Sequence, residues 1–212
     1  MKGLVALVAA LFSFALMGSG VVLAQESTPV AGTFPVTPDP AECQVEERAR
    51  EEFLVLNAEA TPEEFAPPVG TAVEVPMGEA ADAETVAGVV ATAREVLACF
   101  NAGDFPRALS LFTDDAIRTL TEEDPISEEE LSAFLSATPE AVPAGQQSTL
   151  LAVTDVMELE NGRVGAFLAT TDPFAGPDTI YVIFIQEDDR WLIDEITEFL
   201  VPGGSVQATP AP

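Results

Sequence analysis

Histidine is absent from this chain of 212 residues, and the only lysine is Lys2. Without histidine, the chain has no Ser-His-Asp or Cys-His activation of a nucleophile and no histidine-based zinc site. It also lacks the side chain that titrates near pH 7 at its ordinary pKa. No glycine-rich phosphate loop or EF-hand spacing occurs. We therefore expect no metal and no cofactor, and carboxylates are the groups left for acid–base chemistry.

Positive charge is also scarce. Beyond residue 24, seven arginines oppose 36 acidic residues, a net charge of −29. Such a surface repels nucleic-acid phosphates and anionic lipid head groups, because both require clustered Lys or Arg. The sequence therefore predicts no nucleic-acid partner, and no membrane partner for the mature chain.

The N-terminus has the three parts of a signal peptide. Met1-Lys2-Gly3 supplies a positive charge, an apolar run follows over residues 4–17, and Val22-Leu23-Ala24 places a small residue before Gln25. This pattern predicts export and removal of residues 1–24, so that the mature protein is secreted or extracytoplasmic. The alternative is an uncleaved anchor, since the apolar stretch approaches the roughly 20 residues that span a bilayer. The glycines near its end and the Val-x-Ala site favour cleavage.

The chain has two cysteines, Cys43 and Cys99. In an exported protein, a small even number favours a disulfide over a metal site or a catalytic thiol. A bridge would tie the N-terminal segment to the main domain, with a stabilisation of about 4 kcal/mol in the chain-entropy model. Two buried free thiols are the alternative.

Composition predicts one domain with tails. The expected segments are a flexible leader (25–42), a short helix joined to the domain by the disulfide (43–56), a proline-rich linker (57–81), the main domain (82–200) and a disordered tail (201–212).

Apolar periodicity predicts helices first and strands afterwards. One helix follows the N-cap Asp82 and ends before Gly103; a second follows Asp104 and is stopped by Asp114-Asp115, with a short strand over 116–120. A capping box at Ser127 opens a third helix. Four strands follow, over 148–159, 163–171, 179–186 and 191–200. The predicted fold is α+β: a curved antiparallel sheet, made of this four-strand meander and the short strand, packed against three helices.

The predicted strand over 179–186 is apolar on both faces between Ile180 and Ile185. Antiparallel strands in a two-layer domain usually alternate, so something has to cover the second face. The tethered segment 43–56 and a homodimer partner bound through the sheet are the two candidates.

Two stretches carry a family resemblance. They are Cys99-Phe100-Asn101-Ala102-Gly103-Asp104-Phe105-Pro106-Arg107-Ala108-Leu109-Ser110-Leu111-Phe112-Thr113-Asp114-Asp115-Ala116 and Arg190-Trp191-Leu192-Ile193. The first resembles the helix, Gly-Asp break, second helix and Asp-Asp-Ala ending of the nuclear transport factor 2-like superfamily, and the second is similar to its common Trp-hydrophobic strand entry. This superfamily, with a cystatin-like α+β fold, includes the SnoaL-like and ketosteroid-isomerase-like proteins. The resemblance covers roughly residues 82–200.

The resemblance implies a cone-shaped pocket between a concave sheet and the helices. In the isomerase branch, a Tyr on the first helix and an Asp shortly after the Asp-Asp-Ala segment carry catalysis. The matching positions here are Val96 and Leu120, and neither side chain can donate or accept a proton. Isomerase activity is therefore not implied for this chain.

Asp155, Phe167, Tyr181 and Asp194 are the candidate pocket residues. Asp155 interrupts the apolar face of its strand, and Asp194 separates two apolar residues in the last strand. A carboxyl group whose pKa is raised by burial could act as an acid or a base. The alternative is that both carboxylates lie at a strand end or bulge and face water.

Three functions are consistent with these features, because the superfamily hosts enzymes, binding modules and dimerisation domains. The leading hypothesis is a non-catalytic secreted module that binds a small apolar ligand in the pocket or a protein partner through its sheet. The second is a carboxylate-dependent isomerase, dehydratase or hydrolase that uses Asp155 or Asp194. The third is a structural dimerisation module.

Overall fold

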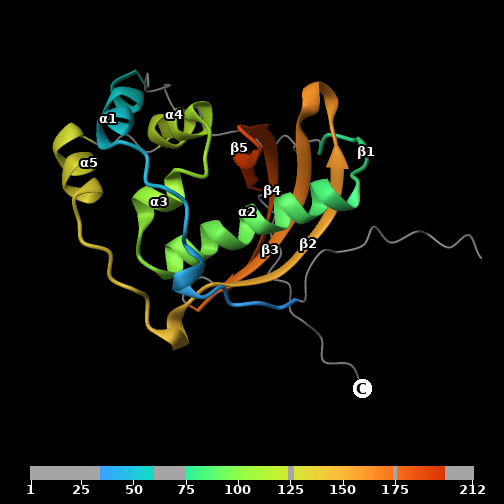
Figure 1. The fold of residues 1–212 in the computed structure, drawn as a ribbon, viewed down its shortest axis with the longest axis horizontal. Helices are drawn as coiled ribbons and strands as arrows, with labels where there is room; N and C mark the ends of the chain where they lie inside the picture. Colours follow the sequence, from blue (N-terminus) through green and yellow to red (C-terminus); the bar gives the residue numbers. More distant parts are fainter. Residues whose placement is uncertain (1–33, 60–74, 124–126, 174–175, 199–212) are drawn as a thin grey trace, which may run out of the picture.

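The computed structural model describes residues 34–59, 75–123, 127–173 and 176–198 (Figure 1). The predicted signal peptide 1–24 and the predicted tail 201–212 lie outside the described residues. In chain order the elements are η1 (Pro40–Glu42), α1 (Arg50–Glu59), β1 (Glu79–Ala80), α2 (Ala83–Asn101), α3 (Phe105–Leu109), α4 (Asp114–Glu123), α5 (Glu128–Leu135), η2 (Ala144–Gln146), β2 (Thr149–Glu158), η3 (Glu160–Gly162), β3 (Val164–Asp172), β4 (Gly176–Glu187) and β5 (Arg190–Glu198).

The strands form one five-stranded antiparallel sheet in the order β1-β2-β3-β4-β5. Strands β2 to β5 are the predicted meander, so the α+β class and the curved antiparallel sheet are confirmed. The first hairpin turns at Asn161 and Gly162, which both have positive φ, as an Asn-Gly turn requires. The fifth strand is β1, which pairs with β2 and not with a segment after the second helix.

Helix α2 lies across the concave face of the sheet (Figure 1). Asp82 caps it by accepting a hydrogen bond from the Thr85 amide, and Gly103 follows its end at a φ of 68°, so both predicted ends are confirmed. Side chains of α2 and the sheet make the core between them. Its fully buried members include Val89, Leu150, Val182 and Phe184.

Trp191, the only tryptophan, packs against α2 at Gly88. A Cβ added to Gly88 would lie 2.3 Å from the indole Cδ1 atom, so the ring needs a residue without a side chain at that point of the helix. The Thr92 hydroxyl also donates to the Trp191 carbonyl at 2.8 Å. The indole is therefore part of the contact between α2 and β5.

The predicted disulfide joins Cys43 to Cys99. The segment before it differs from the predicted leader, because Val36 exchanges two backbone hydrogen bonds with Leu150 of β2, and Asn101 donates to the Pro38 carbonyl. Residues 34–42 thus pack on the domain.

The helix predicted over residues 43–56 begins later, at Arg50, and continues to Glu59. The preceding residues make tertiary contacts with α2 and the end of α3: Gln44 donates its amide to Glu95, and Arg48 donates its amide to Ser110. The first amides of a helix have no partner inside the helix. Here the Gln44 and Arg48 amides find partners in Glu95 and Ser110, so this stretch forms tertiary contacts and the helix begins only at Arg50.

The predicted short strand over 116–120 is wrong, because residues 114–123 form helix α4. Thr113 accepts a hydrogen bond from the Ala116 amide through its hydroxyl, and its carbonyl accepts from Ile117. Asp114 and Asp115 therefore occupy the first turn, where carboxylates are favoured by the positive end of the helix dipole. The described residues hold five α-helices: α1 in the tethered segment, the three predicted for the main domain (α2, α3 and α5), and α4, which was not predicted.

The tethered segment does not cover the second face of the sheet. Helix α1 packs against α4 and α5, within the group of short helices at the C-terminal end of α2 (Figure 1). On the second face, Tyr181 and Ile183 are nevertheless buried within a single chain. Among the described residues, no helix is long and apolar enough to cross a membrane.

Candidate functional site

The structure does not bring the four predicted site residues into one pocket. Asp155 is exposed, at a bulge in β2 where its φ is 50°. Because the bulge shifts the alternation of the strand, Val153 and Val156 are buried and Asp155 faces water. Asp155 therefore does not point into a pocket, and the alternative, a carboxylate that faces water at a bulge, is confirmed for this residue.

Phe167 and Tyr181 contact each other on the second face of the sheet. Their rings meet edge to face with centroids 5.1 Å apart. The Tyr181 ring lies over Gly165, where an added Cβ would be 1.8 Å from the phenol oxygen, and the hydroxyl lies 3.5 Å from the Pro76 carbonyl. Both rings are on the face opposite α2, and so outside the space in which the cone-shaped pocket was expected.

Asp194 is partly buried, and both oxygens of its carboxylate have a partner. One carboxylate oxygen lies 3.0 Å from Nη2 of Arg163, and the other accepts from the Thr113 hydroxyl at 3.1 Å. Arg163 also contacts Glu195 at 2.8 Å. Asp194 therefore links β5 to the start of β3 and to the segment before α4.

Burial raises the pKa of the Tyr181 phenol above its ordinary value, while nearby Arg163 lowers it and Glu195 raises it. Because the folded protein holds the phenol proton more tightly than the unfolded chain, this group adds to the free energy of unfolding below the ordinary tyrosine pKa of about 10. The contribution is lost as the pH rises through the folded pKa.

Tyr181 is the only tyrosine, so phenolate absorbance reports it alone. We expect the titration midpoint of the folded protein to exceed that of the urea-unfolded chain. Equal midpoints would contradict burial of this ring.

The space between the sheet and α2 is occupied by side chains of the core. From α2, Val86, Val89 and Ala93 are at most 2% exposed, and from the sheet Val182 and Phe184 are 0% exposed. The two cavities described below lie elsewhere, among the short helices.

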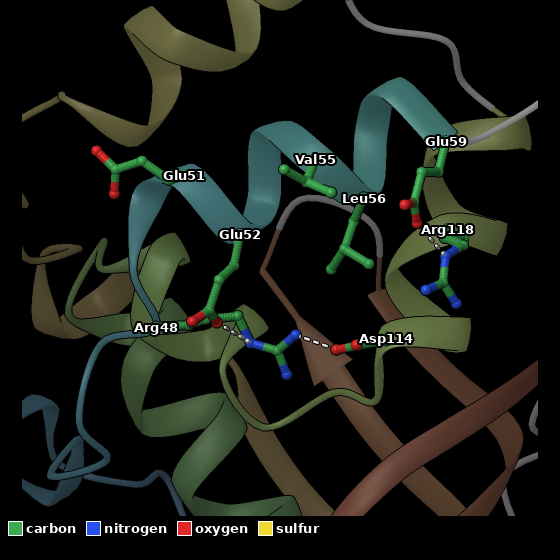
Figure 2. Close-up of a pocket in the computed structure, with 8 residues that line it drawn as sticks. All are labelled: Arg48, Glu51, Glu52, Val55, Leu56, Glu59, Asp114 and Arg118. Atoms are coloured by element: carbon green, nitrogen blue, oxygen red, sulfur yellow. Dashed lines mark hydrogen bonds and ion pairs between the residues drawn. The ribbon is translucent and has the colours of Figure 1, made fainter.

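The first cavity is a polar groove of about 420 Å³ between α1 and α4 (Figure 2). Six of its eight lining residues are charged, and five of these form ion pairs with one another. Arg48 contacts Glu52 and Asp114, and Arg118 contacts Glu59.

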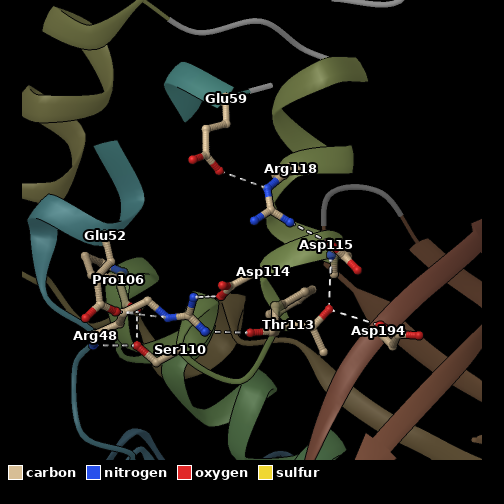
Figure 3. A network of polar contacts seen from close by, with 12 residues as sticks. Arg48, Glu52, Glu59, Pro106, Ser110, Thr113, Asp114, Asp115, Arg118 and Asp194 are labelled. Atoms are coloured by element: carbon tan, nitrogen blue, oxygen red, sulfur yellow. Dashed lines mark hydrogen bonds and ion pairs between the residues drawn. The ribbon is translucent and has the colours of Figure 1, made fainter. Parts of the chain in front are cut away.

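Arg48 is the centre of a wider polar network (Figure 3). Besides its ion pairs, it donates to the Phe112 carbonyl at 3.1 Å and to Ser110 through its backbone amide. Its side chain is 17% exposed, so these bonds are screened less than those of a surface pair. This network holds α1 against the segment between α3 and α4.

The second cavity is apolar, with a volume of about 300 Å³. Helices α1, α3, α4 and α5 each contribute to its wall. The lining residues are Phe53, Leu109, Ile117, Leu120, Thr121, Leu131 and Phe134. Two of them, Leu120 and Phe134, are 39% and 38% exposed, so the cavity opens to solvent between α4 and α5. It can take up an apolar group, because six of its seven lining side chains are aliphatic or aromatic.

The sequence contains the apolar faces that form this cavity, but not their convergence. Leu131 and Phe134 fall on one side of α5 by helical spacing, as do Ile117 and Leu120 in α4. Leu120 and Val96, the two positions that the resemblance aligns with the catalytic Asp and Tyr of the isomerase branch, do not share a site: Leu120 lines the cavity, and Val96 is buried in α2. The sequence signal for the cavity is therefore the apolar spacing within α4 and within α5, which does not show that the two faces meet.

Within the described ranges, no cluster of three or more acidic or cysteine side chains has the arrangement of a metal site. The chain matches no protein-family model, no curated protein and no solved structure. The apolar cavity, with its opening between α4 and α5, is therefore the candidate site on geometry alone.

Proposed function

We propose that this chain is an exported, non-catalytic binding module whose apolar cavity takes up an apolar group of a small ligand or of a protein partner. The observation that carries the proposal is the opening of this cavity. Leu120 and Phe134 leave more than a third of their surface exposed at its mouth, although burial of large apolar side chains is strongly favourable. A bound apolar group would remove this surface from water.

Export is supported by the disulfide and by the N-terminal sequence together. Disulfides persist in oxidising compartments and are rare in the cytosol, and Cys43 is bonded to Cys99 here. The signal-peptide pattern of residues 1–24 gives the same compartment.

Membership of the nuclear transport factor 2-like superfamily is part of the proposal. It is supported by the 99–116 motif, by the entry of β5 at Trp191, and by a curved antiparallel sheet with α2 across its concave face. The proposed binding site differs from the pocket that this family implies, because it lies among α1, α3, α4 and α5.

The two other functions have less support. A carboxylate-dependent enzyme would need a sequestered acid, but Asp155 is exposed and both oxygens of Asp194 are engaged by Arg163 and Thr113. A dimerisation module that uses the sheet would need apolar surface there, but Tyr181 and Ile183 are already buried within one chain. The cavity therefore supports binding best.

The uncharged dye N-phenyl-1-naphthylamine tests this proposal, since its fluorescence rises when it enters an apolar site. We expect the mature protein to bind it, and Leu120→Asp to weaken binding by about tenfold, equivalent to about 1.4 kcal/mol. The cause is a carboxylate placed at the wall of an apolar cavity.

Ile196→Asp is the matched control, because Ile196 is 37% exposed and Leu120 is 39% exposed, and the change adds the same charge on β5. Its affinity for the dye should stay within about twofold of wild type. The proposal is wrong if wild type binds no dye, or if both variants bind it equally well.

A further inference from the structure

A strip of aromatic side chains continues from the mouth of the apolar cavity across the surface. Phe134 lies at the mouth, its ring centroid is 5.3 Å from that of Phe105, and Phe105 is 5.7 Å from Phe100. Phe105 is 43% exposed and does not line the cavity. This aromatic strip, Phe100–Phe105–Phe134, extends beyond the cavity lining, so a ligand that fills only the cavity would leave Phe105 in water.

The helices around the cavity and the strip are strongly acidic. Helices α1, α3, α4 and α5 together hold ten acidic residues and three arginines. Helix α5 begins with three consecutive glutamates, Glu128–Glu130, all of them exposed.

Two of the three arginines in these helices are ion-paired. Arg107 contacts Asp104, and Arg118 contacts Glu59 and Asp115, whereas Arg50 donates to the uncharged hydroxyl of Ser132. An anionic amphiphile such as a fatty acid would therefore meet ten carboxylates against the single charge of Arg50, and net repulsion. A second copy of the chain would bring the same negative charge against this one.

We propose that the cavity and the aromatic strip form the docking surface for a cationic amphipathic peptide segment of a partner protein. One apolar side chain of the segment enters the cavity, and further apolar residues at helical spacing cover Phe105 and Phe134. Basic residues on its other face lie against the acidic helices. This is helix-in-groove recognition, in which the apolar face supplies affinity and the complementary charge supplies orientation and speed of association.

This inference rests on the proposed function, because the anchor side chain occupies the same cavity as the dye. It adds two requirements of its own: the exposed ring of Phe105, and the carboxylates at the start of α5. Neither group lines the cavity itself, and Phe105 touches its wall only through the ring of Phe134.

The experiment measures displacement of N-phenyl-1-naphthylamine by an amphipathic peptide of leucine and lysine. Its counterpart has glutamate in place of every lysine and keeps the same apolar face. We expect the lysine peptide to displace the dye. Neither the glutamate peptide nor oleate should displace it. Phe105→Ala, and separately Glu128→Gln with Glu129→Gln, should each weaken binding of the lysine peptide at least threefold, while the affinity for the dye stays within about twofold of wild type.

The matched control for charge is Asp188→Asn with Asp189→Asn, which removes two exposed carboxylates from the turn between β4 and β5. The adjoining Trp191 packs at Gly88, 12 residues before Phe100 on α2, or about 18 Å along the helix axis. This control should bind the lysine peptide like wild type. An equal loss in both charge variants would show diffuse attraction and overturn the inference.

Dye binding without displacement by the lysine peptide would overturn this inference alone, and displacement by oleate would do the same. Absence of dye binding would overturn the proposed function itself. Analytical ultracentrifugation could show that the wild type is a dimer and that Phe105→Ala is a monomer. This result would assign the aromatic strip to contact with a second copy, and it would also overturn the inference.

Discussion

Replacing Cys43 and Cys99 together with alanine should lower the free energy of unfolding by about 4 kcal/mol. The disulfide closes a loop with a sequence separation of 56, and the chain-entropy model relates the stabilisation to that length. For a chain of this size such a loss lowers the Tm by about 10 °C. Both side chains are small, and Cys99 is fully buried, so alanine adds no polar group to the core.

Urea unfolding followed by the fluorescence of Trp191 measures this loss, because Trp191 is the only tryptophan and lies at the contact of α2 with β5. Wild type treated with a reducing agent should unfold at the same midpoint as the double variant. Equal midpoints for oxidised wild type and the double variant would show that the bridge does not stabilise the domain.

Phe184→Ala should cost about 3–5 kcal/mol, the range for truncating a buried phenylalanine. Phe184 is 0% exposed in β4, at the centre of the packing between the sheet and α2. This cost has two parts: the free energy gained by transferring the ring out of water is lost, and a cavity is left in the core. Phe134→Ala is the matched control, because Phe134 is 38% exposed and its loss should be about 1 kcal/mol.

The comparison distinguishes a filled core from an open pocket between the sheet and α2. In a water-filled pocket, the Phe184 ring would already be partly hydrated, and its removal would cost no more than that of Phe134. Similar unfolding midpoints for the two variants would therefore contradict the packing described for this space.

Elements with strong local signals could be predicted from the sequence. Asp82 and Gly103 delimit α2, the Ser127–Glu130 capping box begins α5, and alternation locates the meander. The caps make their contacts within a few residues of the signal, and the meander pairs strands that follow one another along the chain. The disulfide followed from counting cysteines in a chain predicted to be exported, and needed no geometry.

Elements that depend on tertiary contacts could not be predicted in this way. The later start of α1 results from hydrogen bonds to Glu95 and Ser110, which lie far along the chain. Helix α4 was missed for a different reason, because Asp114-Asp115 was interpreted as a stop although Thr113 caps a helix there.

The candidate site was missed because it is built from the convergence of four short helices. The predicted pocket follows from the family resemblance, which places it against the concave sheet, and its candidate carboxylates, Asp155 and Asp194, come from strand alternation. Here Val89 and Phe184 fill that space, while the extra helix α4 and the tethered helix α1 create a cavity elsewhere. The bulge at Asp155 also reverses the side-chain alternation on which its placement relied.

The central claim is that an apolar group binds among the short helices, and methyl NMR tests it most directly. The protein is labelled at its isoleucine and leucine methyl groups and titrated with N-phenyl-1-naphthylamine. We expect the largest shifts at Ile117 and Leu131 in the cavity wall, and no significant shift at Ile183 and Leu192 on the second face of the sheet. Shifts centred on Ile183 and Leu192, with Ile117 and Leu131 unchanged, would contradict the account.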